Sequence, residues 1–132
     1  MRSGWTLVEL MVVLGIVAIL AAVAFPGYGL VMQKVRRGDA INSLLALQLE
    51  QAAWRNKDWD YATLEELNRA AALSFDGYYQ LQLPTRSEAA FLALAVPLDS
   101  GLQSDDSCGT FAVDQDGPVF SEGYADAACW GR

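Results

Sequence analysis

The feature that most constrains this chain is a long uncharged segment with one carboxylate at its start. No residue from Leu10 to Gln33 carries a charge, and residues 10–25 are apolar at every position. An apolar run of 18 or more residues is long enough to form a membrane-spanning helix. Glu9 stands directly before this run, where a charge is costly and usually has a partner and a function. Nothing within the run can neutralise Glu9, so we expect its partner to come from another molecule or from a chain terminus.

The residues before Glu9 form a short, positively charged leader that ends at Gly4, and they are followed by the aromatic residue Trp5. This arrangement resembles the prepilin signal of the type IV pilin family, in which Glu is the fifth mature residue and Phe is usually the first. The resemblance implies that a prepilin peptidase cleaves between Gly4 and Trp5 and N-methylates Trp5. The freed amine is a cation that can pair with Glu9 of a neighbouring subunit, since two buried charges offset their desolvation only together.

Two other interpretations of the apolar segment compete with this one. Ala22-Val23-Ala24 has the form of an ordinary signal-peptidase site, and cleavage there would release a soluble secreted domain that begins at Phe25. A carboxylate just before the apolar region of a signal peptide counts against that interpretation. A plain signal anchor, the third possibility, leaves Glu9 unexplained.

Composition limits the rest of the chain. With 132 residues we expect one globular domain at 34–132, after a leader at 1–4 and a membrane and filament-core helix at 5–33. The net charge of −7 disfavours binding to the phosphate backbone of nucleic acids, so nucleic acid is not an expected partner. The chain has no histidine, which removes the common nucleophile pairs and the commonest zinc ligand. We therefore expect no enzyme activity, cofactor, metal or small-molecule substrate.

The two cysteines, Cys108 and Cys129, lie near the C-terminus. An even number of cysteines in an exported chain predicts a disulfide. This disulfide would close a loop of about 22 residues and stabilise the fold by roughly 3 kcal/mol on the chain-entropy model. An oxidising compartment also sets the topology, because it puts the C-terminal domain in the periplasm.

Helical spacing continues beyond Pro26, where we expect a kink. The apolar residues after it recur at steps of three and four, which predicts one buried stripe. Three basic residues just after the uncharged run are expected to anchor the chain to lipid headgroups. The stripe consists of Ile41, Leu44, Leu45, Leu47, Leu49 and Ala52 or Ala53, and the basic residues are Lys34, Arg36 and Arg37.

Strand patterns follow the helix. Alternation and breakers predict strands at 78–83, ended by Pro84, and at 90–96, with two more at 109–113 and 119–121. Asp76-Gly77 and the segment 114–117 have turn composition, and Thr63 stands at capping-box distance before Glu66, which predicts a short helix. Short links between consecutive strands indicate an antiparallel meander and therefore an α+β fold.

The C-terminal part is similar to PilE-type minor pilins. Their pattern is matched by the strand start Cys108-Gly109-Thr110, by Asp114 with Gly117, and by the ending Cys129-Trp130. The resemblance implies the type IV pilin fold, with a long N-terminal helix packed on a three- to four-stranded antiparallel sheet and a C-terminal disulfide loop. Segment 114–117 also begins like a calcium-binding EF-hand loop, but the glutamate that should end such a loop is replaced by Ala125.

The expected function is that of a minor pilin. Its precursor is anchored in the inner membrane, and the mature subunit then enters an extracellular pilus that supports adhesion and twitching motility. The implied partners are other pilin subunits, the prepilin peptidase and methyltransferase, and an inner-membrane assembly platform. Two alternatives within the superfamily stay open. One is a pseudopilin of a type II secretion system. The other is a DNA-receptor pilin of a competence system, which needs a basic stripe that Arg69, Arg86 and Arg132 would have to form.

Overall fold

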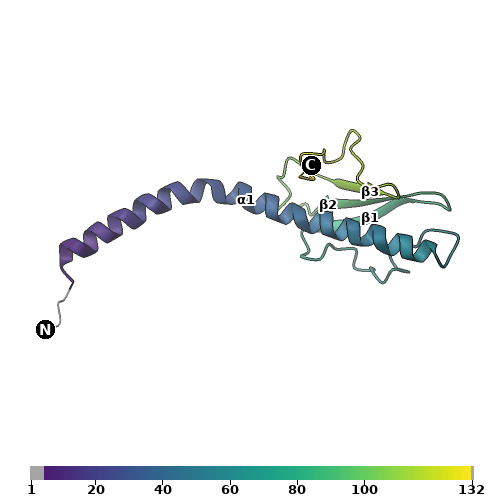
Figure 1. The fold of residues 1–132 in the computed structure, drawn as a ribbon, viewed down its shortest axis with the longest axis horizontal. Helices are drawn as coiled ribbons and strands as arrows, with labels where there is room; N and C mark the ends of the chain where they lie inside the picture. Colours follow the sequence, from purple (N-terminus) through teal and green to yellow (C-terminus); the bar gives the residue numbers. More distant parts are fainter. Residues whose placement is uncertain (1–4, 132) are drawn as a thin grey trace. The chain divides into compact units, whose positions relative to one another are not determined.

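The main element of this chain is one long helix. In this computed structural model, which describes residues 5–131, helix α1 runs from Leu7 to Arg55 (Figure 1). Its backbone stays helical across Pro26 and Gly27, and the bend expected at Pro26 stays a prediction. The chain divides into two units, Met1–Met32 and Gln33–Arg132, and α1 contributes residues to both.

Three strands form the sheet of the second unit. They are β1 (Tyr79–Arg86), β2 (Phe91–Pro97) and β3 (Phe111–Asp114) (Figure 1). Their order is β1-β2-β3, and both neighbouring pairs are antiparallel. The predicted antiparallel meander and the α+β class are therefore confirmed.

Two strand predictions differ from the structure. Strand β1 continues past Pro84, with a register shift between Gln82 and Thr85. Proline is tolerated here because β1 is an edge strand, where a missing N–H donor costs little. The strand predicted at 119–121 is wrong, because that part of the chain contributes only an isolated bridge between Val113 and Pro118. After that bridge the Val119 N–H donates to the Ala112 carbonyl at 3.0 Å, but no backbone N–H of residues 120–121 donates to β3, so the pairing ends there.

The face of α1 that packs on the sheet is shifted from the predicted stripe. Leu44 and Leu47 are fully buried, as expected, but Leu45 is 38% exposed and Leu49 is 72% exposed. Ser43 and Gln51 are buried instead. The core joins this face to residues of all three strands and of the C-terminal loop: Ala40, Leu44, Leu47, Tyr79, Leu81, Phe91, Ala93, Ala95, Phe111, Val113 and Trp130.

The buried polar residues of α1 are hydrogen-bonded, which explains why they can lie inside. The side-chain amide of Gln51 donates to the Ala62 carbonyl at 2.7 Å and accepts from the Ala62 N–H at 2.8 Å. The carboxylate of Asp39 accepts from the Ser74 hydroxyl at 2.5 Å and from the Asp76 N–H at 2.9 Å. These bonds hold the segment before β1 against the helix. A prediction of the buried face from apolar residues alone is therefore wrong, because it leaves these buried polar residues out.

Two of the predicted turns form as expected, and the predicted short helix does not. The hydroxyl of Thr63 accepts from the Glu66 N–H at 3.2 Å, and the Glu66 carboxylate accepts from the Thr63 N–H at 2.7 Å. Hydrogen bonds from the Thr63 N–H and hydroxyl lower the pKa of Glu66. This capping box closes a series of turns at 64–68 rather than a helix. Gly77 and Gly117 adopt positive φ angles of 76° and 133°, which glycine allows in tight turns.

Candidate functional site

Helix α1 begins with a hydrogen-bonded turn that fixes the position of Glu9. The Thr6 hydroxyl accepts a hydrogen bond from the Glu9 N–H at 3.2 Å, and the Thr6 carbonyl accepts one from the Leu10 N–H at 3.2 Å. Thr6 is therefore the N-cap of α1, and Glu9 lies in its first turn. Trp5 is exposed, whereas Gly4, on the other side of the predicted cleavage point, lies outside the described residues.

The carboxylate of Glu9 has no partner within residues 5–131, because no ion pair or side-chain hydrogen bond there engages it. It is the single charged residue of an 18-residue stretch, Leu7–Ala24, that is long and apolar enough to cross a membrane. None of that stretch is buried within the subunit. An exposed apolar surface of this extent marks a membrane or protein interaction site.

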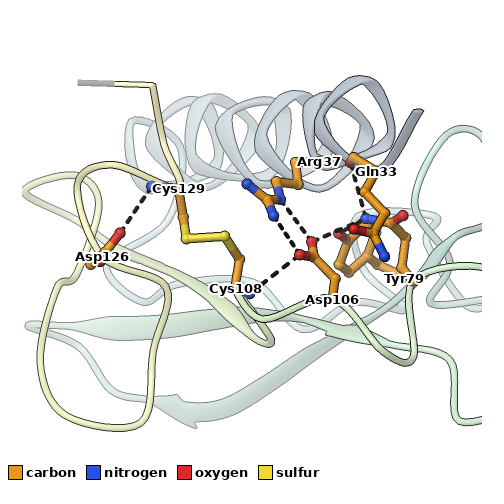
Figure 2. The surroundings of a disulfide bond; sticks show 8 residues. Gln33, Arg37, Tyr79, Asp106, Cys108, Asp126 and Cys129 are labelled. Atoms are coloured by element: carbon orange, nitrogen blue, oxygen red, sulfur yellow. Dashed lines mark hydrogen bonds and ion pairs between the residues drawn. A yellow bond between two sulfur atoms is a disulfide. The ribbon is translucent and has the colours of Figure 1, made fainter. Parts of the chain in front are cut away.

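A second feature, which the sequence pattern did not predict, is a partly buried ion pair between α1 and the loop before the disulfide (Figure 2). The Arg37 guanidinium donates to both carboxylate oxygens of Asp106, with its Nε at 2.8 Å and its Nη2 at 2.5 Å. Gln103 donates to the Asp106 carboxylate at 3.2 Å and to the Tyr79 hydroxyl at 2.9 Å. The prediction that Arg37 anchors lipid headgroups is therefore wrong, because Asp106 occupies its guanidinium. Sixty-nine residues separate the pair, so no local pattern could reveal it.

The ion pair shifts the pKa of both members. Burial by itself raises the pKa of the Asp106 carboxyl, but hydrogen bonds from Arg37 and from the Cys108 N–H, with the charge of Arg37, bring it below its usual range. The hydrogen bond to Asp106 raises the pKa of Arg37. Burial is the main cause that raises the pKa of Tyr79. Both members of the pair are therefore charged at neutral pH.

The predicted disulfide between Cys108 and Cys129 is present, with a Cα–Cα distance of 5.8 Å. A carboxylate holds the backbone at each end: Asp106 accepts from the Cys108 N–H at 3.3 Å, and Asp126 accepts from the Cys129 N–H at 2.9 Å (Figure 2). Trp130, directly after the second cysteine, packs edge-on against Phe111 of β3 with the ring centroids 5.6 Å apart. The disulfide thus ties the C-terminal loop to the core.

Removal of the disulfide by the double substitution Cys108→Ser and Cys129→Ser is expected to lower the free energy of unfolding by about 3 kcal/mol, because the unfolded chain regains the entropy of the open loop. Calorimetry of the full chain in detergent micelles measures the effect as a lower melting temperature. Ser107→Ala, at an exposed neighbouring position, is the matched control. An unchanged melting temperature in the double variant would show that the disulfide adds nothing to the stability of the fold.

The arginines of the domain are divided between paired and unpaired positions. Arg69 pairs with Glu50 at 2.7 Å, and Arg86 pairs with Asp60 at 3.1 Å. Arg132, the third residue of the basic stripe considered above, lies outside the described residues. The two described members of that stripe are therefore occupied by carboxylates. Within residues 5–131 the cations without an ion pair are Lys34, Arg36, Arg55 and Lys57.

The segment at the C-terminal end of α1 combines two of these cations with an exposed aromatic ring. Trp59 is 89% exposed, the most exposed of the large hydrophobic side chains described. Arg55 lies over the Tyr61 ring at 4.8 Å from its centroid, and its guanidinium donates to the Glu88 carbonyl. Arg55, Lys57 and Trp59 line one shallow hollow of about 350 Å³. We call this segment, residues 55–59, the distal basic segment.

The described residues contain no cluster of three or more acidic, cysteine or histidine side chains that could hold a metal ion. Asp114, which starts the EF-hand-like sequence, instead accepts hydrogen bonds from the Asp116 N–H at 2.8 Å and the Gly117 N–H at 3.0 Å. Its carboxylate therefore closes a turn.

Two family models match the chain. The first is described as type IV minor pilin ComP, DNA uptake sequence receptor, and it matches residues 26–112, more than half of the chain. The second is described as prokaryotic N-terminal methylation motif and matches residues 1–25. A comparison with curated proteins found no match. The helix, the three-stranded antiparallel sheet and the disulfide are those of the type IV pilin fold. The chain therefore belongs to the type IV minor pilin ComP family.

Proposed function

We propose that this chain is a structural subunit of a type IV pilus, held first in the inner membrane by α1, with its C-terminal domain in the periplasm, and then assembled into the filament. The observation that carries this proposal is the wholly exposed apolar stretch Leu7–Ala24, with the unpartnered carboxylate of Glu9 in its first turn. Such a surface needs lipid around it before assembly and other subunits around it afterwards. The partners are other pilins and the pilus assembly machinery.

Assembly in this proposal depends on processing at the N-terminus. Cleavage between Gly4 and Trp5 frees an amine, and the same enzyme methylates it. This amine then neutralises Glu9 of a neighbouring subunit inside the apolar filament core. The match of residues 1–25 to a methylation motif supports this sequence of events.

Gly4→Leu is expected to abolish processing, because a tight cleavage site has no room for a branched side chain. An immunoblot of membranes would show a single band at the precursor size, and Ser3→Ala, one residue earlier, is the control that should mature normally. A mature-sized band in the Gly4→Leu variant would contradict the proposed cleavage point.

DNA capture is a second candidate function, and the family description is the observation that favours it over adhesion or twitching motility. The net charge of −7 of the whole chain counts against nucleic acid as a partner. That average hides the local distribution of charge, because phosphate attracts only those cations that no carboxylate already occupies. The family description thus counts against the expectation that DNA is not a partner.

The distal basic segment is the part of the domain that fits DNA best. Lys57 is exposed, and Arg55, whose guanidinium donates to the Glu88 carbonyl, has no carboxylate partner within residues 5–131, so no carboxylate there neutralises either charge. Trp59 offers an exposed aromatic face on which an unpaired base of single-stranded DNA can stack. Asp58 lies in the same loop, where its carboxylate accepts the Trp59 N–H at 3.0 Å and partly offsets the two cations.

A salt titration of single-stranded and of double-stranded DNA binding to the full chain in detergent micelles tests this candidate. Lys57→Gln should weaken binding and reduce the slope of log affinity against log salt by about one, because one phosphate contact is lost. Lys34→Gln is the matched control, since it removes the same charge outside the segment. Equal effects of the two substitutions would contradict the assignment to this segment, and absence of binding by the unmodified chain would contradict DNA capture itself.

A further inference from the structure

A hollow of about 470 Å³ lies beside the C-terminal end of α1. Two aromatic rings belong to its lining: Tyr61 and Phe91 are almost fully buried, and they pack edge-on with their ring centroids 4.9 Å apart. Leu49 and Ala52 of α1 add apolar surface to the lining. Pockets for small ligands have volumes of about 300–1,000 Å³ and mostly apolar walls with a few polar groups. The hollow therefore has the size and the walls of a ligand pocket.

Hydrogen bonds hold the walls of this hollow in place. The side-chain amide of Gln48 donates to the Asp114 carbonyl at 2.9 Å, which ties the turn after β3 to α1. Arg55 donates through its Nη1 to the Glu88 carbonyl, which ties the hairpin between β1 and β2 to the same helix. All of these segments belong to the second unit of the chain. A ligand that enters the hollow therefore does not have to order it, and such preorganisation favours affinity.

The lining also carries polar groups that remain available to a ligand. The Arg55 guanidinium lies over the Tyr61 ring at 4.8 Å from its centroid, and only its Nη1 has a hydrogen-bond partner within residues 5–131. Its Nε and Nη2 form the edge with which arginine binds a phosphate through two parallel hydrogen bonds. Within the same residues no hydrogen bond engages the side-chain amide of Asn56 or the side-chain carbonyl oxygen of Gln48. The hollow thus offers a cation, a free amide and a free acceptor next to two aromatic rings.

This hollow adjoins the smaller one at the distal basic segment. Arg55 and Asn56 line both hollows, and Lys57 and Trp59 line the smaller one. Arg55 is therefore shared by a hollow that can hold one planar group and by an exposed ring on which a second planar group can stack. Single-stranded DNA has a matching arrangement, because a phosphate joins each base to the next and its unpaired bases stack on aromatic side chains.

We infer that the larger hollow holds one unpaired base of single-stranded DNA, while Arg55 binds the phosphate after that base and the next base stacks on Trp59. Asn56 and Gln48 supply a donor and an acceptor for the polar edge of the enclosed base. The charge is complementary, because no acidic side chain of residues 5–131 lines this hollow although the whole chain has a net charge of −7. The inference rests on the proposed DNA capture and adds to it a site for a base.

Filling the hollow tests the inference. Ala52→Phe places a ring in the hollow, and Ala53→Phe, at the next exposed position of α1 and outside the lining, is the matched control. Fluorescence anisotropy with the full chain in detergent micelles measures the affinity for an oligothymidylate and for an abasic oligomer of the same length. Ala52→Phe should weaken binding of the oligothymidylate about tenfold, which corresponds to the loss of one stacked base. It should not change binding of the abasic oligomer, and Ala53→Phe should change neither.

The inference is overturned if Ala52→Phe and Ala53→Phe bind the oligothymidylate equally well. It is also overturned if Ala52→Phe weakens binding of both oligomers to the same extent, because the hollow would then have no role in binding a base. Free thymidine 5′-monophosphate should compete only at a concentration about a hundredfold above that of the oligothymidylate, because the strand joins several contacts in one molecule. Competition at equal concentrations would make the free nucleotide the ligand and would overturn the assignment to a strand.

Duplex DNA distinguishes failure of this inference from failure of the proposal on which it rests. The bases of a duplex are paired and do not enter the hollow, so Ala52→Phe should leave duplex binding unchanged. If the unmodified chain binds duplex DNA but Ala52→Phe has no effect on the oligothymidylate, the inference alone is refuted and DNA capture stands. If the unmodified chain binds neither form of DNA, DNA capture is refuted and the inference with it.

Discussion

Glu9→Ala is expected to leave the precursor in the inner membrane and to reduce its amount in sheared filaments by roughly tenfold or more, because the Trp5 amine of a neighbouring subunit then stays buried without a counter-charge. The carboxylate has no other role within residues 5–131, since no ion pair or side-chain hydrogen bond there engages it. The substitution should therefore leave the domain's fold unchanged. Immunoblots of membranes and of sheared filaments measure the partition.

Two control variants test whether the loss of incorporation comes from the charge at position 9. Glu9→Asp keeps the charge on a shorter side chain and should restore part of the incorporation. Glu65→Ala removes a carboxylate from an exposed position on the domain and should have no effect. Normal amounts of the Glu9→Ala chain in sheared filaments would mean that the pairing between Glu9 and the amine does not drive assembly.

Asp106→Ala is expected to destabilise the domain by about 3 kcal/mol, because it leaves the partly buried Arg37 charge, whose side chain is 16% exposed, without its partner. The carboxylate also accepts hydrogen bonds from Gln103 and from the Cys108 N–H, which lose their acceptor. Urea unfolding of the full chain in micelles at neutral pH measures the loss. Asp105→Ala, at the exposed neighbouring position, is the control, and equal midpoints for the two variants would contradict a stabilising role for the ion pair.

The same residue makes stability depend on pH in one direction. The pKa of Asp106 is lower in the folded chain than its usual value, which is about 3.9 in an unfolded chain. The stabilisation by Asp106 is therefore complete above that unfolded value and is lost as the pH falls through the folded pKa. As the pH falls from neutral into the acid range, Asp106→Asn should lose less stability than the unmodified chain. Identical losses would show that Asp106 is not part of the acid sensitivity.

The parts of the fold that depend on local sequence could be predicted. The uncharged run predicted the exposed apolar span of α1, the composition of residues 76–77 and 114–117 predicted the turns before β1 and after β3, and the two cysteines predicted the disulfide. The errors arose where polar residues point inward. Gln51 and Asp39 are buried because hydrogen bonds to distant segments satisfy them, so counting apolar residues placed the helix stripe on a partly exposed face.

The site was predictable to a similar extent. The motif around Gly4, Trp5 and Glu9 is contiguous, so the sequence alone predicts it as the processing and assembly site, and this stays a prediction. The role of each cation was not predictable, because it depends on which carboxylate the fold brings near. Arg37 pairs with Asp106, and Arg36 lies over the Tyr78 ring. Trp59 had no regular spacing around it, and its exposure appears only in the structure.

The central claim is that α1 stays on the mature chain and becomes the filament core. The intact mass and N-terminal sequence of the protein isolated from its native cell test this most directly. A chain that begins at Trp5 and carries one added methyl group is the predicted result. A chain that begins at Phe25 would contradict the account, because the membrane span and Glu9 would then be absent from the mature protein.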